Sequence, residues 1–198
     1  MLQMIHPEHD IHRTRISGAP PPFSAADYVQ DGKIHLLLAA SGSVATIKIP
    51  NILSSLARYE NLAVRLVLTK SATNFLAGQS AEQPRLETLR EYPNVQGIFL
   101  DEEEWVHPWK RGHDILHIEL RRWAHMMVIA PLSANTLAKI TGGFSDNLLT
   151  SVVRAWDTTG SLGTGENAVP SQSRLTGKKR IIVARTHKRA LYFPLPVL

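Results

Sequence analysis

The sequence of 198 residues contains no cysteine, which excludes disulfide bonds, thiolate metal sites and thiol nucleophiles in this chain. It also lacks any uninterrupted apolar run of the ~18 to 20 residues that a membrane-spanning helix needs. The first thirty residues carry charges, histidines and prolines where a signal peptide would be apolar, so we expect a cytoplasmic protein without a membrane partner. Apolar residues make up 43% of the chain and charged residues 20%, which predicts a globular domain with a buried core.

An excess of positive charge is missing from most of the chain, although the net charge is +5. Residues 174–198 contain 7 basic residues and no acidic one, so 15 of the 22 basic residues and all 17 acidic ones lie in residues 1–173. A protein that reads DNA or RNA needs its basic residues on the folded part. We therefore expect no nucleic-acid partner.

The N-terminal 31 residues have little apolar periodicity and include the run Gly18-Ala19-Pro20-Pro21-Pro22. This composition predicts a flexible leader without a helix or strand of its own. His6, His9 and His12 are spaced by three residues, but no core fixes their geometry. A solvated segment is therefore favoured over a metal site.

Short apolar runs alternate with segments of helical spacing from residue 32 to residue 184. Buried strands are expected at residues 33–40, 63–69, 126–130 and 180–184; helical segments are expected near 47–56, 70–77, 116–124 and 137–152. The acidic run 101–104 is expected to be a linker. Such alternation predicts an α/β fold with a doubly wound, Rossmann-like (flavodoxin-like) parallel sheet in three layers. Residues 185–198 are predicted to form a basic, irregular tail.

Small hydroxyl or amide residues follow three of the four predicted strands, at 41–43, 69–71 and 133–136. Ligands of doubly wound sheets bind at the carboxyl ends of the strands, where such loops present N–H and hydroxyl groups to anions. A single Ser-Gly-Ser turn also has a purely steric explanation, and Ser133 can simply cap a helix. Three such loops at one sheet edge favour a phosphate-bearing ligand. The first loop has neither the Gly-Lys-Ser/Thr ending of a P-loop nor the three glycines of a dinucleotide fingerprint.

His117 is the candidate proton-transfer residue, although a histidine between apolar neighbours is more often structural. His113 lies four residues earlier and could share a helix face with it, but no HExxH pattern accompanies the pair, so no metal site is predicted. Glu119, Arg121 and Arg122 are expected to be solvated helix charges that can pair with one another. The four tryptophans are expected to pack or to reach a subunit interface, with flavin stacking as the alternative.

Four segments together carry a resemblance to a known family: Ile115–Ala124 (ILHIELRRWA), Val128–Ile140 (VIAPLSANTLAKI), Gly142–Thr150 (GGFSDNLLT) and Arg154–Asp157 (RAWD). The chain resembles phosphopantothenoylcysteine decarboxylases and the related halotolerance flavoproteins over about residues 33–158. These are homo-oligomeric flavin-containing cysteine decarboxylases. The resemblance implies a carboxy-lyase of coenzyme A biosynthesis that uses FMN to convert 4'-phosphopantothenoylcysteine into 4'-phosphopantetheine and carbon dioxide.

The resemblance also implies the residues of the site. His117 would be the catalytic histidine, and no metal is implied. FMN would be bound by Gly42, Ser43, Val44, Ser71, Ser133, Ala134, Asn135 and Thr136. The family typically forms trimers with the flavin near a subunit interface, which implies a homotrimer or a heterotrimer with related subunits.

The family pattern is lost after about residue 158. The Pro-Ala-Met-Asn element with its substrate-binding asparagine is absent, and so is the cysteine that reduces the enethiol. Three explanations remain open: a reading error in the gene past Asp157, a variant that stops at the enethiol or uses a partner subunit's cysteine, and a non-catalytic regulatory subunit of a protein phosphatase. A chain without the last strands would also expose a sheet edge.

Overall fold

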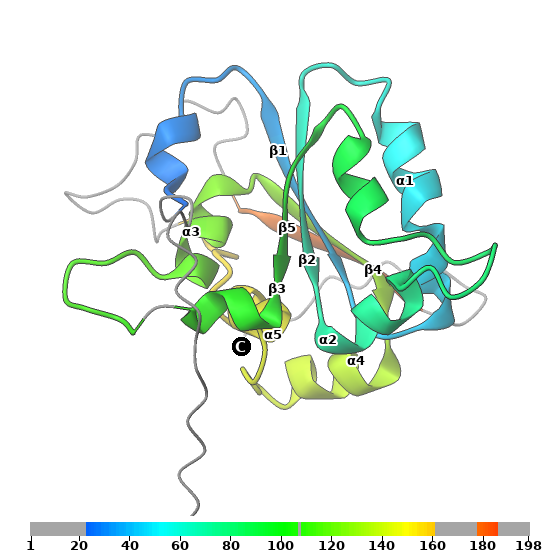
Figure 1. Cartoon of the computed structure of the whole chain (residues 1–198). Helices are drawn as coiled ribbons and strands as arrows, with labels where there is room; N and C mark the ends of the chain where they lie inside the picture. Colours follow the sequence, from blue (N-terminus) through cyan, green and yellow to red (C-terminus); the bar gives the residue numbers. More distant parts are fainter. Residues whose placement is uncertain (1–22, 107, 161–177, 186–198) are drawn as a thin grey trace, which may run out of the picture.

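The computed structural model describes residues 23–106, 108–160 and 178–185, which form a parallel five-stranded sheet covered by helices on both faces (Figure 1). The strands are β1 (Ile34–Ala40), β2 (Leu62–Leu68), β3 (Val95–Leu100), β4 (Met126–Leu132) and β5 (Arg180–Arg185), in the order β3-β2-β1-β4-β5. The order reverses between β1 and β4, which is where doubly wound sheets bind ligands. The predicted α/β fold is therefore confirmed.

Helices connect successive strands. The α-helices are α1 (Ile49–Leu56), α2 (Lys70–Thr73), α3 (Leu116–Trp123), α4 (Ala134–Thr141) and α5 (Leu148–Arg154); the 3-10 helices are η1 (Ala25–Tyr28), η2 (Val44–Lys48), η3 (Asn74–Leu76), η4 (Glu87–Glu91) and η5 (Asp101–Trp105). Pro50 lies in the first turn of α1, where its missing N–H breaks no helical hydrogen bond. None of the helices in the described part of the chain is long and apolar enough to cross a membrane.

Both faces of β1 are buried, which explains its continuous apolar run. Leu37 and Ala39 join the core cluster that packs against α3 and α5, whereas Leu36 and Leu38 join the cluster that packs against α1. Alternate side chains of a strand point to opposite faces, so one apolar run supplies both cores. Figure 1 shows α1 and α3 on opposite sides of the sheet, as the three-layer prediction requires.

The four predicted strands are present, but β3 was not predicted. Its residues are mostly half-buried, Gly97 interrupts the apolar run, and the register with β2 shifts between Val64 and Arg65. The polar Gln96 and Gly97 break the apolar pattern of β3, whereas β5, at the other edge of the sheet, keeps an unbroken apolar run and was predicted. The segment at 101–104 is also no linker, because it forms most of η5 directly after β3.

The expectation of no helix before residue 32 is wrong for the part that the structure describes. Ala25 begins η1 and is buried in the core, while Phe23 and Tyr28 pack against the same cluster. Residues 1–22 with the three N-terminal histidines, residues 161–177 and residues 186–198 of the predicted tail lie outside the described residues.

Candidate functional site

A polar cavity of about 310 Å³ lies at the carboxyl edge of the sheet. The segments that follow three parallel strands line it: Gly42 follows β1, Ser71 in α2 follows β2, and Ser133 follows β4. Asn135 and Thr136, in the first turn of α4, complete this wall. The sequence prediction that these loops meet is confirmed.

Gly42 lets two of these loops approach closely. A Cβ atom at this position would lie 2.4 Å from Ser71 Cβ and 3.1 Å from the Ser71 carbonyl carbon, closer than side chains pack. The Thr69 N–H donates to the Ala40 carbonyl at 3.1 Å and holds the two strand ends together just before this approach. Gly42 is therefore required by the shape of the cavity wall, independently of any ligand.

Ser41 joins the β1 loop to the β4 loop. Its hydroxyl donates to the Pro131 carbonyl at 3.2 Å and accepts from the Ser133 N–H at 2.7 Å, while its own N–H donates to the same carbonyl at 3.0 Å. Ser41 is fully buried, so it fixes the wall without reaching the cavity. The sequence analysis included Ser41 in the turn but assigned it no role.

Ser133 begins α4 as its N-cap, because its hydroxyl accepts from the Thr136 N–H at 3.2 Å. Thr69 caps α2 in the same way, accepting from the Ala72 N–H at 3.3 Å. The unpaired N–H groups and the dipole at the start of a helix favour anions. The eight-residue α4 thus directs a partial positive charge toward the Asn135 side of the cavity.

Asp101 is a cavity residue that the sequence analysis missed. Its carboxylate accepts from the Lys70 N–H at 2.8 Å and from the Leu148 N–H at 3.2 Å, and so ties together the first residues of α2 and α5. Burial raises the pKa of Asp101, and these two hydrogen bonds act against that rise. Its position directly after a strand was the available signal, and it was lost because β3 was not predicted.

Two ion-pairing side chains close the cavity on the α4–α5 side. Lys139, from α4, pairs with Asp146, and this hydrogen bond lowers the pKa of the Asp146 carboxyl. Asn147 caps α5 by accepting from the Thr150 N–H at 2.9 Å. With Lys70 and Asp101, the cavity wall carries two lysines and two aspartates. The cavity wall therefore combines lysines, which suit a phosphate, with aspartates that balance their charge.

The remaining predicted cofactor residues, Ser43, Val44 and Ala134, are not part of the cavity lining. Ser43 caps η2 by accepting from the Ala45 N–H at 3.2 Å. Val44 begins η2 and is 67% exposed. Ser43 and Ala134 adjoin lining residues in the sequence, and Val44 lies two residues after Gly42. The predicted role of all three in binding stays a prediction.

His117 lies in the first turn of α3 and is not part of the cavity lining. Its Nδ1 atom is 2.6 Å from Oε1 of Glu104, which comes from η5, the same short helix that begins at Asp101. His113 precedes the first residue of α3, so the two histidines do not share a helix face. Across the described ranges, no three His, Asp or Glu side chains gather in a way that could hold a metal ion.

The charges of α3 are less solvated than expected, while the expected pairing is present between Glu119 and Arg122. Glu119 is buried, accepting from the Ala25 N–H at 2.8 Å and from Arg122 at 2.7 Å. Arg121 is buried as well. Trp123 and Trp156 belong to the core, which bears out packing for these two; Trp105 and Trp109 are exposed.

Comparison with known proteins decides the family. The model of the flavoprotein family matches residues 24–165. The chain belongs to the flavoprotein family. This flavoprotein is 50% identical over 125 residues to a probable phosphopantothenoylcysteine decarboxylase of Arabidopsis thaliana, a match that covers 63% of this chain and 56% of the relative. It is 47% identical over 132 residues to a phosphopantothenoylcysteine decarboxylase of Oryza sativa subsp. japonica, covering 66% and 54%.

Solved structures agree with this family. The FMN binding protein AtHal3 superimposes with a TM-score of 0.56 at 42% identity, covering 78% of this chain and 66% of that one. A mutant phosphopantothenoylcysteine decarboxylase complexed with pantothenoylaminoethenethiol superimposes with a TM-score of 0.53 at 42% identity, covering 77% and 67%. The predicted family and fold are confirmed. The chain spans about half the length of the curated relatives it matches.

Proposed function

We propose that this flavoprotein binds FMN, with the phosphate-bearing end of the cofactor in the carboxyl-edge cavity. The observation that carries the proposal is the cavity of about 310 Å³ in which Gly42, Ser71 and Ser133, from the ends of three parallel strands, meet the first turn of α4. Asn135, Lys70 and the start of α4 line this cavity, and an amide, a lysine and a helix N-terminus suit an anionic ligand. These residues fit the phosphate and the adjoining polar chain of FMN.

We infer further that the chain takes part in the decarboxylation of 4'-phosphopantothenoylcysteine to 4'-phosphopantetheine, a step of coenzyme A biosynthesis. The support is the identity of 47–50% to relatives named for this activity. Bound FMN supplies the oxidation and reduction that make loss of carbon dioxide feasible. The contribution of this chain is to hold the cofactor phosphate and to move a proton at the imidazole of His117. A homotrimer, or a heterotrimer with related subunits, is the assembly we propose.

The lack of any cysteine favours a second candidate. A sequence with no thiol supplies no cysteine to a reduction step, so as a decarboxylase the chain would work with a cysteine-bearing partner subunit. The second candidate is a non-catalytic flavoprotein subunit that regulates a protein phosphatase. Both candidates share the FMN site, and they differ in whether His117 is needed.

The first test is the visible absorption of the purified full chain after addition of FMN and removal of unbound cofactor. Flavin bands near ~375 and ~450 nm, with FMN released on denaturation, are the expected result. Protein that stays colourless after reconstitution would contradict the proposed site.

The second test separates the two candidates. Decarboxylation of 4'-phosphopantothenoylcysteine is assayed with a cysteine-bearing family member present, for the wild type and for His117→Asn. An enzyme loses about 10²- to 10⁴-fold in rate when its proton-transfer group is removed, while FMN binding persists. A regulatory subunit instead keeps its effect on a phosphatase in the His117→Asn variant.

A further inference from the structure

We propose that Glu104 is the positioning residue of His117: its carboxylate holds the proton on Nδ1 and leaves Nε2 as the proton acceptor. The inference deepens the proposed function, because it rests on His117 being the proton-transfer residue. Its basis is the pairing of η5 with the first turn of α3, two elements that the sequence separates by a loop.

The contact between His117 and Glu104 is short, and Glu104 is the more deeply buried of the two side chains. Nδ1 of His117 lies 2.6 Å from Oε1 of Glu104; the side chain of Glu104 is 3% exposed and that of His117 is 22% exposed. An ionised carboxylate only accepts hydrogen bonds, so the hydrogen between these atoms is carried by the imidazole nitrogen. A neutral histidine with its proton on Nδ1 has its lone pair on Nε2. The carboxylate is thus anchored in the protein, while the imidazole keeps access to solvent and to a ligand.

The second oxygen of Glu104 adds to this argument. Oε2 is buried and has no hydrogen-bond partner among the described residues. A buried carboxylate without full hydrogen bonding is unfavourable unless a positive charge stabilises it. When Nε2 takes up a proton, the resulting imidazolium supplies that charge at Nδ1. The same carboxylate therefore selects the accepting tautomer and stabilises the protonated product, as in catalytic triads.

The position of Glu104 connects this pair to the cofactor cavity. Asp101, at the start of η5, binds the first N–H groups of α2 and α5 in the cavity wall. Glu104 lies three residues later, at the other end of the same short helix. One 3-10 helix after β3 thus holds both the cavity wall and the histidine, which fixes their relative placement.

The test reads the tautomer directly, without cofactor or substrate. The full chain is labelled with ¹⁵N-histidine, and the ring nitrogens are observed by long-range ¹H–¹⁵N NMR at neutral pH, with His117→Asn assigning the signals. We expect His117 with a protonated Nδ1 and an unprotonated Nε2. Glu104→Met removes the acceptor and is expected to shift the ring toward the other tautomer. Glu104→Gln keeps an acceptor of the same length and is expected to retain the wild-type tautomer.

The matched control is Glu102→Met, which removes an exposed carboxylate from the same 3-10 helix and is expected to leave the His117 signals unchanged. A wild-type ring protonated on Nε2 would overturn the proposal, and so would a Glu104→Met variant with wild-type His117 signals. Where Glu104→Met does not fold, the wild-type and Glu104→Gln spectra still decide the tautomer.

An activity readout then separates positioning from simple structure. In the FMN-loaded chain with a cysteine-bearing partner, Glu104→Gln is expected to lower kcat about 10- to 100-fold with KM little changed, because only the stabilising charge is lost. An unchanged kcat with active wild type would overturn the role of Glu104. If the wild type binds no FMN or does not decarboxylate, the proposed function fails, and the tautomer measurement still stands on its own.

Discussion

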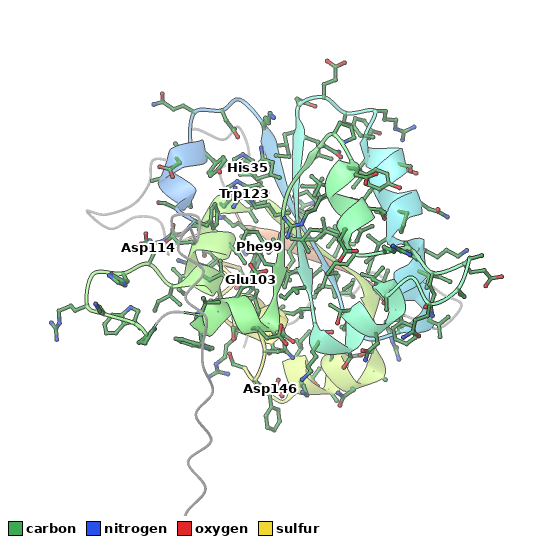
Figure 2. All side chains as sticks on the ribbon, viewed as in Figure 1. His35, Phe99, Glu103, Asp114, Trp123 and Asp146 are labelled. Carbon is green, nitrogen blue, oxygen red and sulfur yellow. The ribbon has the colours of Figure 1, made fainter. Side chains whose placement is uncertain are left out.

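Titratable side chains gather at both ends of the strands: at the amino edge, where the strands begin, and at the carboxyl edge, where they end. Their surroundings differ between these two edges. At the amino edge, His35 stacks between Trp123 and His125, with ring centroids at 4.5 and 4.8 Å. Its Nδ1 lies 3.0 Å from the Trp123 carbonyl, and its Nε2 lies 3.0 Å from the Asp31 carboxylate. At the carboxyl edge, Asp146 and the cavity residues surround an open space. Figure 2 shows His35 and Trp123 at the end of the sheet opposite Asp146.

The pKa values that are displaced furthest belong to the amino-edge cluster, which we define as His35, Arg65, Trp123, His125 and Lys179. Burial lowers the pKa of His125 to about 4, with His35 and Lys179 adding to the effect, and burial lowers the pKa of Lys179 to about 8. Lys179 donates to the carbonyls of Arg121 and Arg122, at the end of α3. The rings and the guanidinium of the cluster contact one another, and Lys179 contacts the backbone. A displaced pKa therefore marks packing at this edge, and the cavity with its converging donors marks the candidate site at the other.

The largest expected effect is on stability and comes from Arg65 in the amino-edge cluster. Its guanidinium lies 3.7 Å from the ring centroid of Phe23, 4.5 Å from Tyr28 and 4.6 Å from Trp123. Arg65→Ala removes these contacts and leaves a cavity, so we expect a loss of about 2–5 kcal/mol in the free energy of unfolding, measured by urea denaturation.

The comparison of edges predicts that FMN affinity stays close to that of the wild type in Arg65→Ala under conditions where the variant is folded. The matched variant Arg65→Met refills much of the volume without the charge and should lose less stability. A variant that is folded but binds FMN more than tenfold more weakly would show that the amino-edge cluster supports the site.

This cluster also shows what sequence reasoning could not reach. The run at 63–69 predicted a buried strand correctly despite Arg65, because its neighbours are apolar. The partners of the guanidinium, Phe23 and Tyr28, belong to a segment whose composition indicated a leader. Contacts between residues about forty positions apart leave no local periodicity, so the packing of Arg65 on Phe23 and Tyr28 is apparent only in the fold.

At the carboxyl edge, sequence reasoning predicted some residues and missed others, for a similar reason. Gly42, Ser71 and Ser133 were predicted together because each follows a strand with a clear apolar run. Asp101 and Glu104 were missed because the half-exposed edge strand β3 gave no such run. Their roles depend on pairing with α2, α5 and α3, which local sequence does not specify. Residues after strands with an unbroken apolar run were thus predictable, and those after β3 were not.

Gly42 gives the second test of the comparison, since the same substitution can be made near each edge. Gly42→Ala forces a Cβ to within 2.4 Å of Ser71 Cβ. Overpacking of this kind costs about 1–3 kcal/mol, which corresponds to about a 5- to 150-fold weaker FMN affinity when the distortion falls on the binding wall. The affinity is measured by quenching of FMN fluorescence during titration.

Gly32 supplies the matched control. It precedes β1 near the amino edge, has a φ of +70°, and nothing lies within 4 Å of an added Cβ. Gly32→Ala is expected to lower stability by about 1–2 kcal/mol through backbone strain alone, with FMN affinity unchanged. Equal effects of the two substitutions on FMN affinity would contradict the proposal that FMN binds at the carboxyl edge.

The smallest expected effect is the pH dependence contributed by His125. Because its folded pKa of about 4 lies below the ordinary value of 6.5, the fold favours the neutral ring. The stabilisation is complete above pH ~6.5 and is lost as the pH falls toward 4. The ring is only partly buried, so solvent screening reduces the loss to on the order of 1 kcal/mol. Asp101 acts in the opposite direction, since its raised pKa favours folding as the pH falls.

His125→Asn separates these opposing contributions, because an amide oxygen can still accept the His35 N–H that now donates to Nδ1 at 2.9 Å. The variant should lose less stability than the wild type between pH 6.5 and 4, measured by urea denaturation at each pH. The charges around the ring are those of His35, Lys179 and Asp31, and they are unchanged in this comparison. If the two proteins lose stability in parallel, the acid sensitivity belongs to other groups, and the ring of His125 acts at this edge by packing alone.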